Sequence, residues 1–320
     1  MSDNIHENDY VGEFPAWHGK GVNLGRMFDA REAIEYANLD YEVQKVPLFI
    51  VDRQDEIVQE VDRCATVRMD LPANSPDHVL GIVGRSYTVV QNRDAFEFFN
   101  EVTGDGAAYF TSAGVLGHGE KIFLVAKLPL DYWVEKDKFE SFVTLVSGHD
   151  GMNALKVFTT SVRVVCQNTL NMALKQTKLS VSLRHTRNVY DRLLEAPAIL
   201  GLATLEFRKT QELFQALAKQ PITVPLFNQY VEELFPSENP NKATLAHRES
   251  ITMLLDDPLN ATPGIKHTWY SAHQSLVQYV DHMMPMRAGK DRFENGMFGS
   301  GAALKTKAVD LAAKYAFGEV

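Results

Sequence analysis

The chain has 320 residues, of which 45% are apolar and 23% are charged, proportions typical of folded proteins that exclude wholesale disorder. The N-terminal segment is polar and acidic, and no stretch approaches about eighteen consecutive apolar residues, so we expect neither a signal peptide nor a membrane span. Cys64 and Cys166 lack CxxC spacing, which predicts two buried thiols in a cytoplasmic protein without a disulfide framework.

Charge is distributed unevenly along the chain. The net charge is −9, yet residues 155–192 hold seven lysines and arginines against one aspartate and carry +6, which leaves −15 for the rest. A phosphate-binding protein needs clustered cations, and this basic segment supplies them within an otherwise acidic chain. Two interpretations remain open: the cations bind an anionic partner, or they pair with carboxylates elsewhere in the fold.

The first half of the chain predicts short helices between strand-like segments. Asp29 and Asn92 are candidate N-caps of two helices. These helices are expected at residues 30–37 and 94–102, and strands at residues 41–51, 79–90, 108–116, 121–128, 139–147 and 155–166. A glycine-rich turn at residues 117–120 predicts a hairpin. Asn168 or Thr169 is expected to cap a further helix, over residues 168–175.

Beyond residue 187 the apolar residues recur at helical spacing. The pattern predicts one long helix, or two that break at Pro197, and then helices at residues 226–234, 242–255, 268–282 and 302–315. We therefore predict an α+β fold, with a largely antiparallel β-meander and packed helices in the first half and a helical second half. The expected division is residues 1–195 for the α+β domain and residues 196–320 for the helical region.

The basic segment contains the candidate nucleic-acid-binding residues. Arg184, His185 and Arg187 form a compact cluster where a long helix is expected to begin, and such groups bind phosphate. A solvated helix start capped by Thr186 explains the same residues. Arg163 lies in an apolar strand, where its charge needs solvent, a carboxylate or a phosphate. The full candidate set is Lys156, Arg163, Lys175, Lys178, Arg184, His185 and Arg187.

The sequence SGHDG at residues 147–151 offers a different chemistry. Adjacent His149 and Asp150 are metal-ligand types, and with His185 they form the basis of a hypothetical metal-dependent enzyme. A turn with Asp–Gly geometry explains the pair as well and is favoured, because the motif lies between two strands. Cys166 is interpreted as a buried thiol rather than a nucleophile. We therefore assign no catalytic residue and no metal ligand, and favour a protein that is not an enzyme.

The motif FPAWHGKG supplies the remaining candidates. Trp17 and His18 would stack on a base beside Lys20, although an N-terminal aromatic anchor is the commoner use of such a tryptophan. The glycine-rich stretches at residues 117–120 and 298–305 lack the GxxxxGK[ST] spacing of a P-loop. The sequence therefore predicts no cofactor.

Several motifs in order resemble the phage/plasmid-related family classed as domain of unknown function 932. They are AWHGKG (16–21), YTVVQNRDAFEF (87–98), SAGVLGHGEKIFLVAKL (112–128), SGHDG (147–151), SVRVVCQNTLNMAL (161–174), RHT (184–186) and GSGAALKTKAVDLA (299–312). The resemblance covers roughly residues 14–315. It implies an origin in a bacteriophage or another mobile element, with no catalytic residues to carry over.

The expected order of a helix, a three-strand meander, a strand and a helix is similar to the core of phage single-strand annealing recombinases. This analogy implies a basic groove that binds single-stranded DNA, and self-assembly into a homo-oligomer, but fold transfers function poorly. Three hypotheses follow. The first is a single-stranded DNA-binding or annealing accessory of recombination or replication. The second is an anti-restriction or host-takeover protein that contacts a host protein, and the third is the metal-dependent enzyme.

Overall fold

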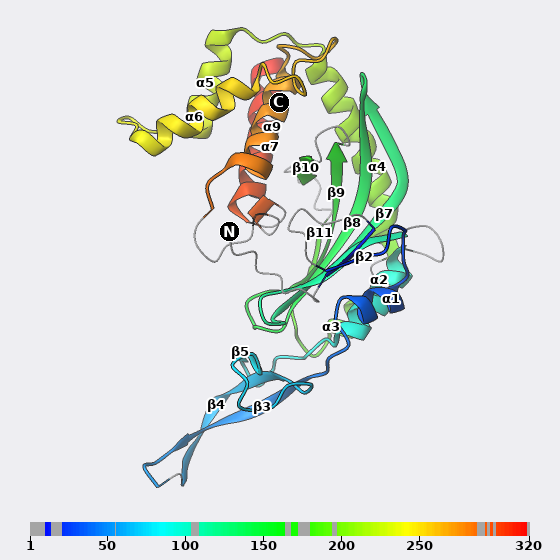
Figure 1. Cartoon of the computed structure of the whole chain (residues 1–320), viewed down its shortest axis with the longest axis vertical. Helices are drawn as coiled ribbons and strands as arrows, with labels where there is room; N and C mark the ends of the chain where they lie inside the picture. Colours follow the sequence, from blue (N-terminus) through cyan, green and yellow to red (C-terminus); the bar gives the residue numbers. More distant parts are fainter. Residues whose placement is uncertain are drawn as a thin grey trace.

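The computed structural model describes residues 10–13, 21–54, 56–103, 109–163, 168–171, 180–193, 197–286, 292, 295–296 and 299–318. A large sheet forms the body, a narrow β-arm extends from one end of it, and a group of helices lies at the other end (Figure 1). The α+β prediction is therefore confirmed.

The large sheet is a meander with additions at both edges. Its described strands run in the order β10-β9-β8-β7-β6-β1-β2, and β11 also pairs with β9. The central strands are β6 (Tyr109–Leu116), β7 (Lys121–Val134), β8 (Asp137–Gly148) and β9 (Leu155–Arg163), each antiparallel to the next. The edge strands are β1 (Tyr10–Gly12), β2 (Val22–Asn23), β10 (Asn168–Asn171) and β11 (Ser180–Leu183). Only β1 and β2 pair in parallel among them.

Alternation along β7 divides its side chains between two faces. Ile122, Leu124 and Ala126 point into the main core, whereas Phe123 and Val125 belong to a small cluster on the opposite face. The main-core face is covered by α1 (Ala30–Tyr36), α2 (Asn92–Thr103) and α4 (Pro197–Ala218). Asp29 caps α1 through a reciprocal bond with Glu32, as the sequence predicts.

One apolar core joins the sheet to the helical second half. Phe214 of α4 lies 5.9 Å from Phe139 of β8, measured between ring centroids, and Tyr270 donates a 2.9 Å hydrogen bond to Asp137. The helices beyond α3 (Val189–Leu193) and α4 are α5 (Val224–Leu234), α6 (Lys242–Leu254), α7 (Trp269–Gln278), the π-helical turn η1 (Tyr279–Met283) and α9 (Ser300–Phe317). None of the described helices is long and apolar enough to cross a membrane.

The helical end contains a buried ion pair. Lys305 of α9 donates a 2.8 Å hydrogen bond to Asp281 in η1, and both side chains are buried. Burial lowers the pKa of Lys305, while Asp281 acts in the opposite direction. Isolated charges are costly in a protein interior, so this pair links α9 firmly to the turn that follows α7.

The arm consists of β3 (Val43–Val51), β4 (Ile57–Arg68) and β5 (Val79–Val83), joined in that order by antiparallel pairing. β5 pairs with β4 only as far as Cys64, so the outer part of the arm is a two-stranded ribbon. Most of that ribbon is exposed, including Phe49, Ile57 and Val58. An isolated two-stranded ribbon is only marginally stable in water, so the base of the arm must supply its stability.

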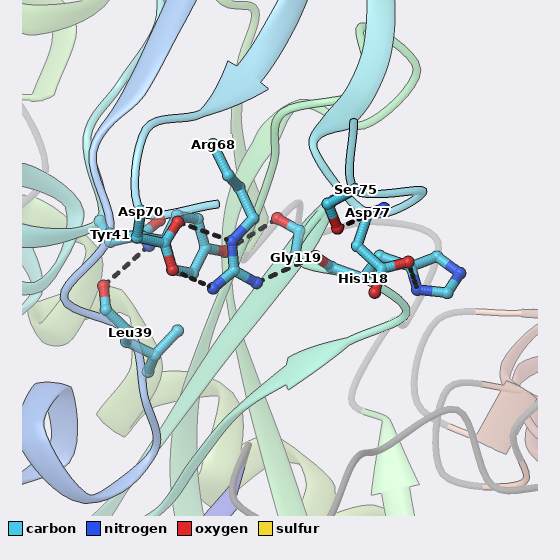
Figure 2. Close-up of polar contacts among 9 residues, drawn as sticks. Leu39, Tyr41, Arg68, Asp70, Ser75, Asp77, His118 and Gly119 are labelled. Atoms are coloured by element: carbon cyan, nitrogen blue, oxygen red, sulfur yellow. Dashed lines mark hydrogen bonds and ion pairs between the residues drawn. The ribbon is translucent and has the colours of Figure 1, made fainter. Parts of the chain in front are cut away.

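Arg68 at the end of β4 attaches the arm to the body. Its guanidinium donates two hydrogen bonds to Asp70 and a 3.0 Å bond to the carbonyl of His118, and it lies 3.9 Å over the Tyr41 ring. The Tyr41 hydroxyl donates in turn to the Gly119 carbonyl, so β4 is fixed to the β6–β7 hairpin (Figure 2). The Arg68 bonds also lower the pKa of Asp70.

The strands of the structure differ from the sequence-based expectation in three segments. β4 was missed because its outer half mixes charged and apolar residues. Residues 87–90 are irregular rather than strand, since the side chain of Tyr87 and the backbone of Thr88 bond to other loops. Residues 168–171 form β10 instead of the start of a helix, and residues 172–179 lie outside the described residues. Pro197 does begin α4, which confirms the predicted break.

We expect Arg68→Met to lower the free energy of unfolding by about 1.5–3 kcal/mol, because buried hydrogen bonds to a charged group are lost together. Urea denaturation would measure this loss. Arg63→Met, which removes an exposed arginine from the same strand, should stay within about 0.5 kcal/mol of the unsubstituted protein. Equal stability of the two variants would show that Arg68 does not anchor the arm.

Candidate functional site

The SGHDG turn, residues 147–151, is built by the carboxylate of Asp150. One carboxylate oxygen accepts from the backbone nitrogens of Met152 and Asn153, and the other accepts from the Asn153 side chain at 2.6 Å. Gly81 of β5 packs against this turn so closely that a Cβ atom there would lie 2.5 Å from the Cα of Asp150. The predicted turn is confirmed, and it is the part of the body against which β5 of the arm packs.

His149 is buried at the point where the turn meets α2 and the arm. Its Nε2 lies 2.9 Å from the side-chain oxygen of Asn92, and its carbonyl accepts a 2.6 Å bond from the Thr66 hydroxyl. The Asn92 amide nitrogen donates to the Leu39 carbonyl, so its oxygen is the acceptor and Nε2 of His149 carries the proton. Asn92 therefore does not cap α2, as the sequence had suggested, but holds the histidine.

Burial lowers the pKa of His149 to about 3, and the neighbouring His185 and the guanidinium of Arg68 act in the same direction. The Asp150 carboxylate acts in the opposite direction without offsetting burial. His149 is therefore neutral at physiological pH and acts as a structural hydrogen-bond donor. Its Nδ1 is buried and has no hydrogen-bond partner among the described residues.

His185 lies next to this cluster. Its ring stacks on Tyr87 with 4.9 Å between centroids, and its Nδ1 lies 3.2 Å from the Thr88 carbonyl. The Thr88 nitrogen donates a 3.0 Å bond back to the His185 carbonyl. Burial lowers the pKa of His185, so its ring is a neutral support beneath the surface rather than a cation offered to solvent. The flanking Arg184 and Arg187 are exposed.

The side chains of His149, Asp150 and His185 are not placed to bind one metal ion together. Nε2 of His149 is engaged by Asn92, and the Asp150 carboxylate is used within its own turn. Across the described part of the chain, no group of three or more His, Cys, Asp and Glu side chains is placed to hold a metal ion. The geometry at His149, Asp150 and His185 is that of a buried structural junction.

A cavity of about 500 Å³ opens beside this junction, between the arm and the body. We call it the basic pocket, and its lining residues are Lys45, Arg85, Ser86, Tyr87, Thr88, Thr186, Arg187 and Asn188. Three of these side chains are cationic, three carry aliphatic hydroxyls, and none is a carboxylate. Such a lining favours an anionic ligand with several oxygen acceptors.

Hydrogen bonds fix the walls of the basic pocket. Lys45 of β3 donates to the backbone carbonyls of Arg85 and Tyr87 at 2.6 and 2.9 Å, which holds the loop of residues 84–88 against the arm. The Tyr87 hydroxyl donates a 2.8 Å bond to the Gly148 carbonyl, and Thr88 is bonded to His185. A pocket whose walls are already ordered needs little rearrangement when a ligand binds.

The pocket cations differ in their partners. Arg85 pairs with Glu60 at 2.5 Å and with Asp62 at 3.0 Å, both on β4. Within the described residues, Arg187 forms no ion pair, and the same holds for Arg184 just outside the pocket. Arg187 is therefore the pocket cation most available to a ligand.

Some of the other predicted site residues are described by the structure, and others lie outside the described residues. Lys156 is exposed on β9 opposite Ser182, two residues before Arg184, so these two cations share one end of the β9–β11 pair. The backbone of Arg163 lies at the far end of β9, and its side chain is not described. Lys175, Lys178, Trp17, His18 and Cys166 lie outside the described residues. Lys45 and Arg85 were missed, because no local pattern distinguishes them from other surface cations.

A second cavity, of about 980 Å³, lies between α1 and α2. Its lining contains four carboxylates, from Asp29, Glu35, Asp40 and Glu97, and only two arginines. One of these arginines, Arg93, is paired with Asp40. This lining has a net negative charge and does not suit a polyanion.

Stability should decrease as the pH falls below about 6.5, because an unfolded His149 takes up a proton near that pH whereas the folded one does so only near pH 3. His149→Gln keeps an N–H donor for Asn92 and removes this titration. Urea denaturation between pH 7.5 and 4 should therefore show a shallower slope for the variant, by about 1.4 kcal/mol per pH unit. An unchanged slope would mean that His149 is accessible to protons in the folded state.

Comparison with known proteins identifies the family of the chain. Searches of curated proteins and of solved structures give no match. The model of the family described as a domain of unknown function (DUF932) matches residues 79–297, which include the SGHDG turn and both body loops of the basic pocket. That match covers more than half of the chain. The protein therefore belongs to the DUF932 family.

Proposed function

We propose that this protein binds single-stranded DNA, with phosphate groups held at the base of the arm. The observation that carries the proposal is the basic pocket, which gathers Lys45, Arg85 and Arg187 from three separate segments and contains no carboxylate in its lining. Lys45 and Arg85 also have partners within the fold, whereas Arg187 forms no ion pair among the described residues and is open to an anion. The cations come from β3, the 84–88 loop and the 184–188 loop.

The chemistry of the lining supports phosphate as that anion. Most protein contacts to a DNA strand go to phosphate and sugar, and they come from arginine, lysine and small hydroxyl side chains. Ser86, Thr88 and Thr186 supply such hydroxyls around the cations. The cavity of about 500 Å³ has room for a phosphate with its sugar, which a flexible single strand can place inside it without unpairing.

Cations outside the pocket extend the binding surface. Arg184 lies next to it in sequence, and Lys156 lies close by on β9. Both are exposed, so they are available for further phosphates along the same strand. The rest of the chain carries −15 outside residues 155–192, which repels DNA from other faces and confines binding to this one. Stacking by Trp17 and His18 stays a prediction, as does a role in recombination or replication.

We expect labelled single-stranded DNA to bind with an affinity that falls steeply as salt rises, measured by fluorescence anisotropy. Arg184→Ala/Arg187→Ala should weaken binding and reduce the slope of log K against log salt by about 1.4, or 0.7 for each lost phosphate contact. Arg208→Ala/Lys219→Ala removes two exposed cations near α4 and should leave both quantities unchanged. Absence of binding at low salt would refute the proposed function.

The arm favours a second candidate function, a protein–protein contact with another copy of this chain. Its outer ribbon exposes Phe49, Ile50, Val51, Ile57 and Val58, each with at least 44% of its surface accessible. Contiguous exposed apolar residues mark interaction surfaces. Residues 48–62 carry a net charge of −4, opposite in sign to the basic segment, so the arm of one copy complements the basic face of another. Contact with a host protein instead of a second copy stays a prediction.

Light scattering after size-exclusion chromatography would test this contact. Ile57→Ser/Val58→Ser should reduce the mass of the assembly, because these side chains are 65% and 64% exposed in the single chain and need a partner to be buried. Leu245→Ser/Met253→Ser changes two apolar residues on α6 that are also exposed, by 50% and 61%, and should leave the mass unchanged. A single-chain mass for the unsubstituted protein at all concentrations would contradict self-association.

A further inference from the structure

We propose that Arg85 is shared between the arm and the basic pocket, and that Glu60 and Asp62 of the arm compete with a bound phosphate group for its positive charge. This competition rests on the proposed function, because it presupposes that the pocket takes phosphate. The arm carboxylates then act as an intramolecular substitute for the ligand and set how tightly the pocket holds it.

The contacts of Arg85 support this role. Its Nη2 lies 2.5 Å from Glu60, and its Nε lies 3.0 Å from Asp62. Glu60 and Asp62 are two residues apart on β4, so their side chains leave the same face of the strand and meet one edge of the guanidinium. Arg85 also lines the basic pocket, so the same side chain faces a carboxylate pair and a cavity suited to an anion.

Charge explains the expected effect. The pocket cations Lys45, Arg85 and Arg187 together carry +3, and the two carboxylates on Arg85 reduce the local net charge to +1. A phosphate that approaches Arg85 is attracted by the pocket and repelled by Glu60 and Asp62 at short range. Neutral substitutes for the two carboxylates would restore the full attraction.

The pairing is also weak enough for a ligand to displace. The side chain of Arg85 is 54% exposed, that of Glu60 49% and that of Asp62 92%. Ion pairs at such exposure are only slightly stabilising, because solvent screens them. A phosphate, with its larger charge and its fit to a guanidinium edge, is the stronger partner. Once the ligand holds Arg85, the 84–88 loop keeps its bonds to Lys45 of the arm. The arm also keeps its bonds to the body, from Thr66 to the His149 carbonyl and from Arg68 to the His118 carbonyl.

Binding of inorganic phosphate, by calorimetry, and of single-stranded DNA, by anisotropy, would be measured for Glu60→Gln/Asp62→Asn. We expect both ligands to bind about three- to tenfold more tightly than to the matched control Glu56→Gln/Glu97→Gln. The control removes two exposed carboxylates that do not contact Arg85, so it corrects for net charge. On an Arg85→Ala background the gain should disappear, because the carboxylates act through that arginine.

The outcomes separate this inference from the proposed function. Equal affinities of the two double variants for phosphate, or a gain that persists with Arg85→Ala, would overturn the sharing of Arg85. Phosphate binding that responds as expected, without any binding of single-stranded DNA, would overturn the proposed function and leave the sharing intact. Phosphate binding by none of the variants would overturn the pocket itself. All the substituted carboxylates are on exposed side chains, and urea denaturation would confirm that each variant is folded.

Discussion

The 2.6 Å hydrogen bond from the Thr66 hydroxyl to the His149 carbonyl joins the arm to the body, and the surrounding structure depends on it. The same turn receives the Tyr87 hydroxyl and packs against Gly81, while the His149 ring binds Asn92 at the start of α2. The large sheet, α2, the arm and the 84–88 loop therefore meet at the SGHDG turn, residues 147–151. A buried polar group without a partner is costly, so each of these bonds fixes the position of the element that makes it.

The two histidines in the interior of this junction are neutral, and the buried Asp150 carboxylate and Arg68 guanidinium are both engaged in hydrogen bonds. His149 and His185 both have lowered pKa values because they are buried, so neither adds a positive charge beneath the basic pocket. The positive charge of the basic pocket therefore comes from Lys45, Arg85 and Arg187, whose side chains are exposed.

The sequence predicted those features that depend on local patterns. Strand-forming residues separated by short turns identified the meander of β6 to β9, Asp29 was identified as the cap of α1, and Asp150 before a glycine identified the turn. Contacts between distant segments were not predictable. Lys45 and Arg187 are far apart in the chain and meet only because β4 returns to the body at Arg68, and β4 itself had no clear alternation. The basic cluster at residues 184–187 was found, but its histidine proved to be buried.

The outer edge of the arm is shaped by Pro47. β3 is one of the two edge strands of the small sheet, and Pro47 has no N–H group to offer to a neighbouring strand. The pairing with β4 also shifts register immediately after Pro47. A strand that added to this edge could extend its ladder only over Leu48–Val51 before it met the proline. Pro47 thus limits how far the exposed apolar ribbon can act as a template for strand addition.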